Sequence, residues 1–306
     1  MNMKWIIITL KENKKVFNEL NNFFSQNNIS LSYYFITKEM TEETKEKLFE
    51  DLLTVTNVLL LDANKALNNS QVMFICGIIA GRQIPFFITG YKDEKNIPVE
   101  FKKCNVFENF DDVMNNLKIN LPYYIDEENK KFALKLLYKK DITFNADNFA
   151  KFIEKNNLEM CNLFFQAGMD VNISDSHGVP MICRAARKSN KKTMIWLLDN
   201  GAKIDVISED RGYSAVMDAV WKSNEDLVEL LCERGANLSF ISRDGQSVLV
   251  LAIGGPNSRI CDILIKYGAD PYIKDKMGMS AFDYATLFKQ QHLLDLIYAQ
   301  KEKNEA

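Results

Sequence analysis

Residues 212–219 read Gly-Tyr-Ser-Ala-Val-Met-Asp-Ala, and residues 278–285 read Gly-Met-Ser-Ala-Phe-Asp-Tyr-Ala. The glycines that begin these two stretches belong to a series whose members are 33 or 34 residues apart, and a second glycine series keeps the same register. Self-similarity at a fixed period of this length indicates a stack of similar structural units. The first series is Gly178, Gly212, Gly245 and Gly278, and the second is Gly168, Gly201, Gly235 and Gly268.

Each landmark of the repeat predicts a piece of local structure. Glycines of the second series follow apolar runs such as 227–231, where a residue past a helix end turns left-handed, a conformation that glycine adopts at little cost. Glycines of the first series lie in short polar segments, which are typical of tight hairpins. Ser214, Ser247 and Ser280 follow them at positions where a hydroxyl can cap a helix. One unit is therefore predicted to be a hairpin, a helix, a turn and a second helix.

This unit resembles the ankyrin repeat, whose signature has a period of 33 residues and a Thr-Pro-Leu-His tetrapeptide. The tetrapeptide is degenerate here, with Ser-Ala-Val-Met at 214–217 and Ser-Val-Leu-Val at 247–250. The resemblance implies an all-α ankyrin-repeat solenoid over residues 143–306, with about five repeats. It also implies that this part of the chain binds another protein in its concave groove.

In the ankyrin family, the hairpin tips and the exposed side of each first helix line the binding groove. Carried over by register, these positions hold Trp, Tyr, Arg and Met, which are enriched in protein interfaces. For Trp221, packing against a neighbouring repeat stays open as an alternative to partner binding. The predicted protein-binding residues are Arg187, Arg211, Tyr213, Trp221, Arg243 and Met279.

Residues 1–125 follow a different pattern, in which apolar runs suited to strands alternate with helical patterns. This alternation predicts a parallel sheet with helices on both faces, which is a three-layer α/β domain of the flavodoxin-like type. A charged amphipathic stretch over 126–142 predicts a helix that connects this domain to the repeats. The predicted strands lie at 4–10, 31–37, 56–62 and 84–89.

The order of these elements, with the stretch 74–85 before the fourth strand, resembles the nucleoside deoxyribosyltransferase-like and TIR-like families. In these families a helix carries a Glu-x-Gly-x-Ala motif, whose glutamate acts at the anomeric carbon of a nucleoside or a nicotinamide dinucleotide. Gly77 and Pro85 fit that pattern, but Ile75 stands at the position of the glutamate. An isoleucine can neither act as a nucleophile nor stabilise an oxocarbenium charge, so we predict no catalytic residue.

Two functions stay open on this basis. The first is a non-catalytic protein-interaction module whose α/β domain has lost its catalytic site. The second is an N-glycosidic-bond enzyme acting on nucleotides or NAD, with the repeats as a recruiting domain. In the second case a nucleotide ligand would bind at Asp62, Asn64 and Ser70, near the end of the third strand, where such sheets bind ligands. Alternatively, Asp62 merely ends a strand and Ser70 caps a helix. The missing glutamate favours the interaction module.

The composition argues against several other classes. A net charge of −3 gives no broad basic field for nucleic acid or anionic membranes. No apolar run approaches the about 20 residues that a transmembrane helix needs. Six cysteines and two histidines show no metal-ligand or disulfide spacing, so we predict no metal and no cofactor. We expect a reduced, cytoplasmic protein whose partner is another protein of unknown identity.

Overall fold

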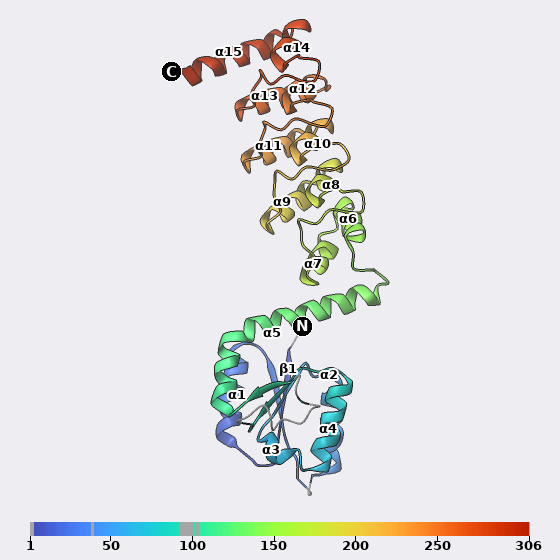
Figure 1. Cartoon of the computed structure of the whole chain (residues 1–306), viewed down its shortest axis with the longest axis vertical. Coiled ribbons are helices and arrows are strands. Elements are labelled where there is room, and N and C mark those ends of the chain that lie inside the picture. Colours follow the sequence, from blue (N-terminus) through green and yellow to red (C-terminus); the bar gives the residue numbers. More distant parts are fainter. Residues whose placement is uncertain (1–2, 38–39, 92–100, 102–103, 306) are drawn as a thin grey trace. The chain divides into compact units, whose positions relative to one another are not determined.

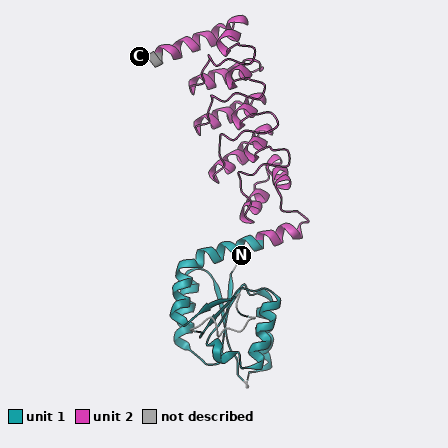
Figure 2. Ribbon diagram, viewed as in Figure 1, with its two compact units in different colours: residues 1–132 teal, residues 133–306 magenta. Residues whose placement is uncertain are grey.

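The chain forms two compact units, residues 1–132 and residues 133–306 (Figure 2). The structure is a computed structural model that describes residues 3–37, 40–91, 101 and 104–305. The boundary between Phe132 and Ala133 lies inside a single helix, α5 (Phe110–Lys139). The stretch at 126–142 that was predicted to connect the two parts therefore belongs largely to the C-terminal part of α5.

Unit 1 contains a parallel sheet, which among the described residues has the strand order β2-β1-β3-β4-β5. The first four strands in the chain lie within or overlap the four predicted apolar runs. The strand β5 was not predicted, because it has three residues and none of them is fully buried. The strands are β1 (Lys4–Thr9), β2 (Ser30–Phe35), β3 (Asn57–Leu60), β4 (Phe86–Thr89) and β5 (Asn105–Phe107).

Helices cover both faces of this sheet, as Figure 1 shows for α1 and α5 on one side and α2 and α4 on the other. Successive side chains of a strand point to opposite faces. Accordingly, Ile6 and Ile8 enter a core with α2 and α4, whereas Trp5 and Ile7 enter a second core with α1 and α5. The helices of unit 1 before α5 are α1 (Lys14–Gln26), α2 (Glu42–Thr54), α3 (Ala63–Ala66) and α4 (Ser70–Gly81).

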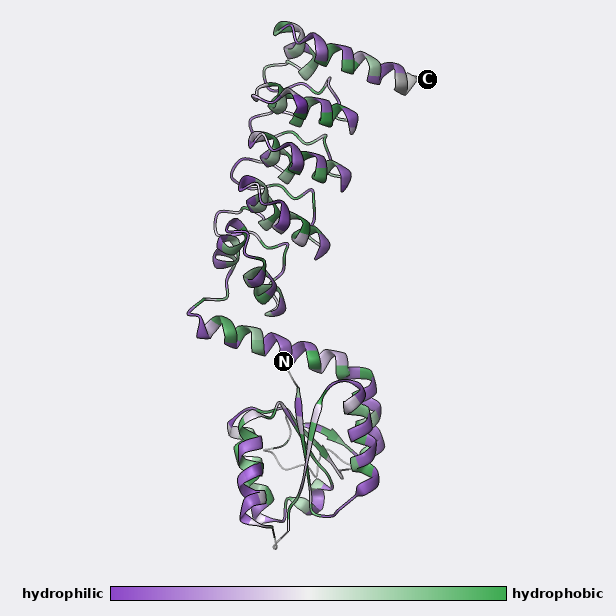
Figure 3. Cartoon of the chain, turned by 180° about the vertical axis from the view of Figure 1, so that it is seen from behind, coloured by the Kyte–Doolittle hydropathy of each residue, from purple (hydrophilic) through white to green (hydrophobic). Residues whose placement is uncertain are grey.

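Unit 2 consists of five helix pairs within residues 143–305, all of which the structure describes. Most of these helices carry both apolar and polar residues, so hydrophobic and hydrophilic stretches alternate along the stack (Figure 3), whereas all six residues of α12 are apolar and buried. One hydrophobic core runs through all the repeats. The pairs are α6 (Ala146–Glu154) with α7 (Leu158–Gln166), α8 (Met181–Arg187) with α9 (Lys191–Asp199), α10 (Ala215–Trp221) with α11 (Glu225–Glu233), α12 (Val248–Ile253) with α13 (Ser258–Lys266), and α14 (Ala281–Leu287) with α15 (Gln291–Glu305).

The two glycine series have the backbone conformation that the repeat predicted. All eight glycines have φ between +66° and +95°, a region that is costly for residues with a Cβ. Antiparallel bridges join Ser174 to Pro180, Ile241 to Ser247 and Lys274 to Ser280, so each bridge closes a hairpin at a glycine of the first series. The prediction of hairpins and left-handed helix ends is therefore confirmed.

We expect Gly212→Ala to lower the free energy of unfolding more than Gly235→Ala. Both glycines have positive φ, so each variant carries about 1–2 kcal/mol of backbone strain. At Gly212 an added Cβ would also lie 2.8 Å from the backbone nitrogen of Arg243, whereas at Gly235 it would meet nothing within 4 Å. Denaturant unfolding of the two variants measures the difference, and equal losses would contradict the close approach of neighbouring hairpins.

Candidate functional site

Successive hairpins of unit 2 contact each other through their backbones. The amide of Glu209 donates to the carbonyl of Gly178 at 2.9 Å, and the amide of Arg243 donates to the carbonyl of Arg211 at 3.3 Å. The tips therefore form a continuous edge beside the C-terminal ends of the first helices. We call this surface the hairpin face; it comprises residues 175–179, 208–213, 242–246 and 275–279 of the hairpins and residues 187–188, 221–222, 254–256 and 287–288 at the helix ends.

Trp221 is the large aromatic side chain at the middle of the hairpin face. It ends α10 and is 57% exposed, so its ring is not buried against a neighbouring repeat. The ring of Tyr213, which is buried, lies at 6.5 Å in an edge-to-face arrangement and supports it. Trp221 also lines a pocket of about 350 Å³ with Gln246 of the next hairpin. The remaining lining residues are Val220, Ser223, Val250, Leu251, Gly254, Gly255 and Pro256.

Two glycines of the fourth repeat, which have no side chain of their own, line this pocket. Gly254 and Gly255 stand at the register positions that Trp221 and Lys222 occupy one repeat earlier. An added Cβ at either position would meet only carbonyl oxygens of residues 250–252 within 4 Å. The hairpin face thus presents an exposed aromatic ring beside a preformed cavity.

Arg211 and Arg243 lie at adjacent hairpin tips and are exposed. Among the residues that the structure describes, neither guanidinium takes part in an ion pair or a side-chain hydrogen bond. Met279 is partly buried, whereas Met277 at the tip of the same hairpin is 81% exposed. Both arginines are therefore available to a partner, and of the two methionines Met277 is the more accessible.

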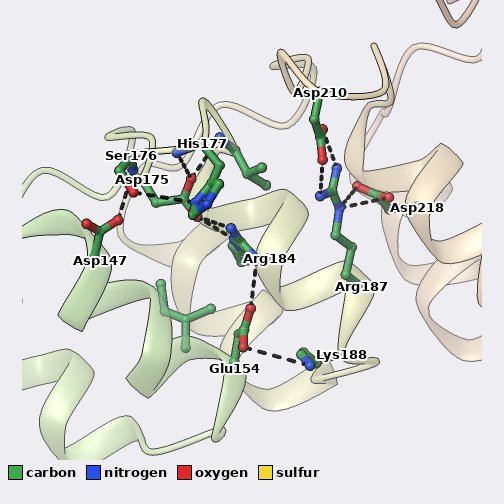
Figure 4. A network of polar contacts seen from close by, with 12 residues as sticks. Asp147, Glu154, Asp175, Ser176, His177, Arg184, Arg187, Lys188, Asp210 and Asp218 are labelled. Atoms are coloured by element: carbon green, nitrogen blue, oxygen red, sulfur yellow. Dashed lines mark hydrogen bonds and ion pairs between the residues drawn. The ribbon is translucent and has the colours of Figure 1, made fainter.

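Arg187 has a different role from the one its register suggested (Figure 4). Its guanidinium contacts Asp210 at 2.7 Å, Asp218 at 3.0 Å and the Ser208 hydroxyl at 3.1 Å. These residues come from the following repeat, so Arg187 joins the second repeat to the third. With its side chain only 13% exposed, this arginine is engaged inside the stack and does not present a free guanidinium.

Asp218 carries the buried carboxyl group of this network, and the sequence-based prediction did not include it among the site residues. Its side chain is fully buried in α10, and burial raises the pKa of its carboxyl to about 6 although Arg187 beside it acts in the opposite direction. The hydrogen bond from Arg187 holds the pKa of Asp210 well below its usual range. An aspartate inside the apolar run 215–220 was the signal that could have pointed to this buried pair.

The register position of Asp218 supports the hairpin in other repeats as well. Arg184 pairs with Asp175 of its own hairpin and, at 3.0 Å, with Glu154 of α6 (Figure 4). Tyr284 donates from its hydroxyl to Asp275 at 2.7 Å. In three of the four repeats with a hairpin glycine, position six after this glycine therefore carries a polar side chain that is linked, directly or through Arg187, to an aspartate of the hairpin, whereas the fourth repeat has Leu251 there.

The three residues predicted to form a cleft in unit 1 do not line one common pocket. Asp62 follows β3, is exposed and has φ +50°, and its amide donates to the Thr89 hydroxyl at 3.0 Å. Ser70 begins α4 and lines a pocket of about 300 Å³, which Asp62 and Asn64 do not line. Ile75, which is 3% exposed, lines the same pocket and packs in the core. The other lining residues are Ile36, Met40, Lys45, Leu48, Phe49, Gln71 and Phe74.

Within the described parts of the chain, no cluster of three or more His, Cys, Asp or Glu side chains is placed to hold a metal ion. Over the same residues, no helix combines the length and the apolar character that crossing a membrane requires.

Comparison with known proteins agrees with the geometry of unit 2. The family model for ankyrin repeats matches residues 149–242 and 217–305, which together span more than half of the chain. An ankyrin repeat-containing protein of Treponema pallidum (strain Nichols) is 29% identical over 246 residues, which covers 79% of this chain and 81% of that protein. An alignment of that length also includes part of unit 1. The chain therefore belongs to the family of ankyrin-repeat proteins.

Proposed function

We propose that this protein is a non-catalytic interaction protein that holds a protein partner on its hairpin face. The observation that carries the proposal is Trp221, which is 57% exposed beside a cavity of about 350 Å³. Energetic hot spots of protein interfaces are enriched in Trp, Tyr and Arg and lie near the centre of the contact. Trp221 lies in the third of five repeats, and Arg211 and Arg243 flank it with free guanidinium groups.

The surroundings of Trp221 favour binding because they fix the ring before a partner arrives. Tyr213 packs edge-to-face against it, and aromatic pairs of this kind contribute about 0.5–1.5 kcal/mol beyond the area they bury. Tyr213 itself is held by its backbone, since its amide donates to the buried hydroxyl of Ser208 at 3.3 Å. A fixed aromatic side chain loses little conformational entropy on binding, which increases affinity.

Site-specific crosslinking can identify the partner without assuming its identity. A photoreactive amino acid at position 246 should capture a protein in cells, because Gln246 lines the pocket beside Trp221. The same amino acid at position 123 is the matched control, since Tyr123 is 61% exposed on α5 in unit 1. A protein that crosslinks at 246 and not at 123 is the partner to purify.

We expect Trp221→Ala to weaken binding of that partner by about 30-fold or more, because truncating a hot-spot tryptophan costs about 2 kcal/mol or more. Tyr123→Ala should leave the dissociation constant unchanged. Isothermal titration measures both constants, and circular dichroism checks that each variant is folded. Binding by Trp221→Ala as tight as that of the parent would remove the hairpin face as the binding site.

We further propose that unit 1 is a three-layer, flavodoxin-like domain that resembles the nucleoside deoxyribosyltransferase-like and TIR-like families but does not cleave N-glycosidic bonds. The strand order and the two cores of the sheet support the fold. The apolar, buried Ile75 at the glutamate position supports the lost activity. Incubation with NAD and a panel of nucleosides should release no base, as followed by chromatography. Turnover that disappears in an Asp62→Ala variant would overturn this proposal.

We also propose a cytoplasmic location. The six cysteines are free thiols, and five of them are buried. Burial raises the pKa of Cys76 and of Cys161 to about 12, which keeps these thiols protonated and unreactive. Unpaired cysteines of this kind are typical of proteins in reducing compartments.

A further inference from the structure

We infer that the partner binds through an extended peptide segment in which an aromatic or large apolar side chain is flanked by Asp or Glu residues. The inference rests on the proposed function, because it takes the hairpin face as the binding surface. It adds the chemistry of the partner, which follows from the cavity beside Trp221 and from the charges that surround this cavity.

The cavity fits one large apolar side chain of the partner. Its lining includes Val220, Trp221, Val250, Leu251 and Pro256, whereas Ser223 and Gln246 are the lining residues with polar side chains. One large side chain that enters a cavity of about 350 Å³ would leave water and cover the exposed flank of the tryptophan ring. An aromatic side chain would gain a ring contact with Trp221 in addition to this burial.

The positively charged side chains on the same part of the hairpin face favour carboxylates in the partner. Arg211, Lys222 and Arg243 are exposed, and among the described residues none of them is in an ion pair. Asp210, which could neutralise Arg211, is already bound to Arg187 at 2.7 Å. Glu209 and Asp244 are the exposed acids of the same two hairpins, so cations exceed free acids on this part of the surface. A guanidinium binds a carboxylate through two parallel hydrogen bonds, which gives the contact direction as well as energy.

The spacing of the arginines favours an extended partner. Arg211 and Arg243 belong to neighbouring repeats whose tips are joined by a backbone hydrogen bond. Packed helices lie about 8–10 Å apart, and three residues of extended chain span about 10 Å. Acidic residues two or three positions apart in an extended segment can therefore meet both arginines while an apolar residue near them enters the cavity.

A random library of 12-residue peptides displayed on phage, panned on the full chain, tests this inference. Panning on the Trp221→Ala variant in parallel removes clones that bind elsewhere. We expect the clones that need Trp221 to carry an aromatic or large apolar residue within three positions of at least two acidic residues. One enriched peptide is then synthesised, and its dissociation constant is measured by fluorescence anisotropy.

Charge reversal provides the second test on the same peptide. Arg211→Glu combined with Arg243→Glu should raise the dissociation constant about 10-fold or more, and a peptide with Lys in place of its acidic residues should bind this double variant better than it binds the parent. Lys191→Glu combined with Lys192→Glu is the matched control, because these exposed lysines begin α9 outside the hairpin face. This control should leave the dissociation constant unchanged.

The outcomes separate the inference from the proposed function. Clones that need Trp221 but lack acidic residues would overturn the inference and leave the hairpin face standing as a binding surface. An unchanged dissociation constant in the double arginine variant would overturn it as well. If no enriched clone depends on Trp221, both the inference and the proposed site are wrong.

Discussion

Replacing Arg187 with alanine should lower the free energy of unfolding of unit 2 by about 3–5 kcal/mol, because the change leaves a buried carboxylate without its counter-ion. Asp218 is fully buried and pairs with Arg187 at 3.0 Å. Asp210 and Ser208 lose a donor in the same variant, so the hairpin of the third repeat loses its link to the second repeat. Replacing an exposed arginine by alanine would lower the free energy of unfolding by about 1 kcal/mol at most.

Denaturant unfolding of the full chain measures the loss, and hydrogen exchange of residues 208–221 localises it. We expect faster exchange in this segment, because repeats are stabilised by their neighbours. The matched control is Arg234→Ala, since Arg234 forms an exposed pair with Asp199 at 3.0 Å between the same two repeats. If both variants lose equally little stability, the buried pair does not hold the two repeats together.

At neutral pH, Asp218→Asn should lower the free energy of unfolding much less than Arg187→Ala does. The size of this decrease should depend on pH. Burial raises the pKa of Asp218 to about 6 in the folded protein, against an ordinary value of 3.8. Between these two values the folded state binds more protons than the unfolded state, so this group adds stability as pH falls. The asparagine variant lacks this proton uptake. The melting temperature of the parent relative to that of Asp218→Asn should therefore rise steadily from pH 7 to pH 4. A relative melting temperature that falls over this range would contradict the burial of a charged carboxyl.

The fold could be predicted from the sequence because few residue types can occupy its key positions. Only glycine adopts positive φ at little cost, so the spacing of Gly212, Gly245 and Gly278 fixed both the hairpins and the period. Three strands of unit 1, β1, β3 and β4, could be predicted because each is an apolar run buried in the sheet. The edge strand β2 could be predicted from its aromatic residues, although only Tyr34 in it is buried. The strand at 105–107 and the continuity of α5 through Pro122 depend on contacts between distant segments, so no local pattern shows them.

The candidate site was predictable only in part. Register alone placed Trp221, Arg211 and Arg243 on the exposed edge of the stack, and the structure has all three exposed there. Register could not separate Arg187 from these residues, because Arg187 and Trp221 are equivalent positions of consecutive repeats. What distinguishes them is the buried Asp218, which is 31 residues from Arg187 in the sequence. An ion pair between repeats requires knowledge of which side chains the fold brings together.

The cavity beside Trp221 also depends on a pair of repeats and not on one. It is lined by the tryptophan at the end of α10 and by the two glycines that occupy the register positions of Trp221 and Lys222 in the next repeat. The Gly254-Gly255-Pro256 sequence alone indicates only a turn. That this turn lines a pocket with Trp221 becomes visible only when the two repeats are packed together.

In unit 1 we expect Trp5→Ala to lower the free energy of unfolding by about 3–5 kcal/mol, as is usual for removing a buried aromatic side chain. Trp5 is fully buried on the interior strand β1, and its ring lies 4.8 Å from that of Phe87 and 5.0 Å from that of Phe24. Truncation to alanine leaves a cavity between the sheet and α1 that close-packed neighbours cannot fill. Denaturant unfolding followed by circular dichroism measures this loss.

Trp5→Phe should lower the free energy of unfolding far less than the decrease in side-chain volume suggests. Within the described structure the indole Nε1 of Trp5 has no hydrogen-bond partner, and an unsatisfied buried donor costs about 1–3 kcal/mol. Phenylalanine keeps the ring contacts with Phe24 and Phe87 and removes this donor, so the two effects offset each other and the net loss should be about 1 kcal/mol or less. A loss in Trp5→Phe as large as that in Trp5→Ala would contradict this offset.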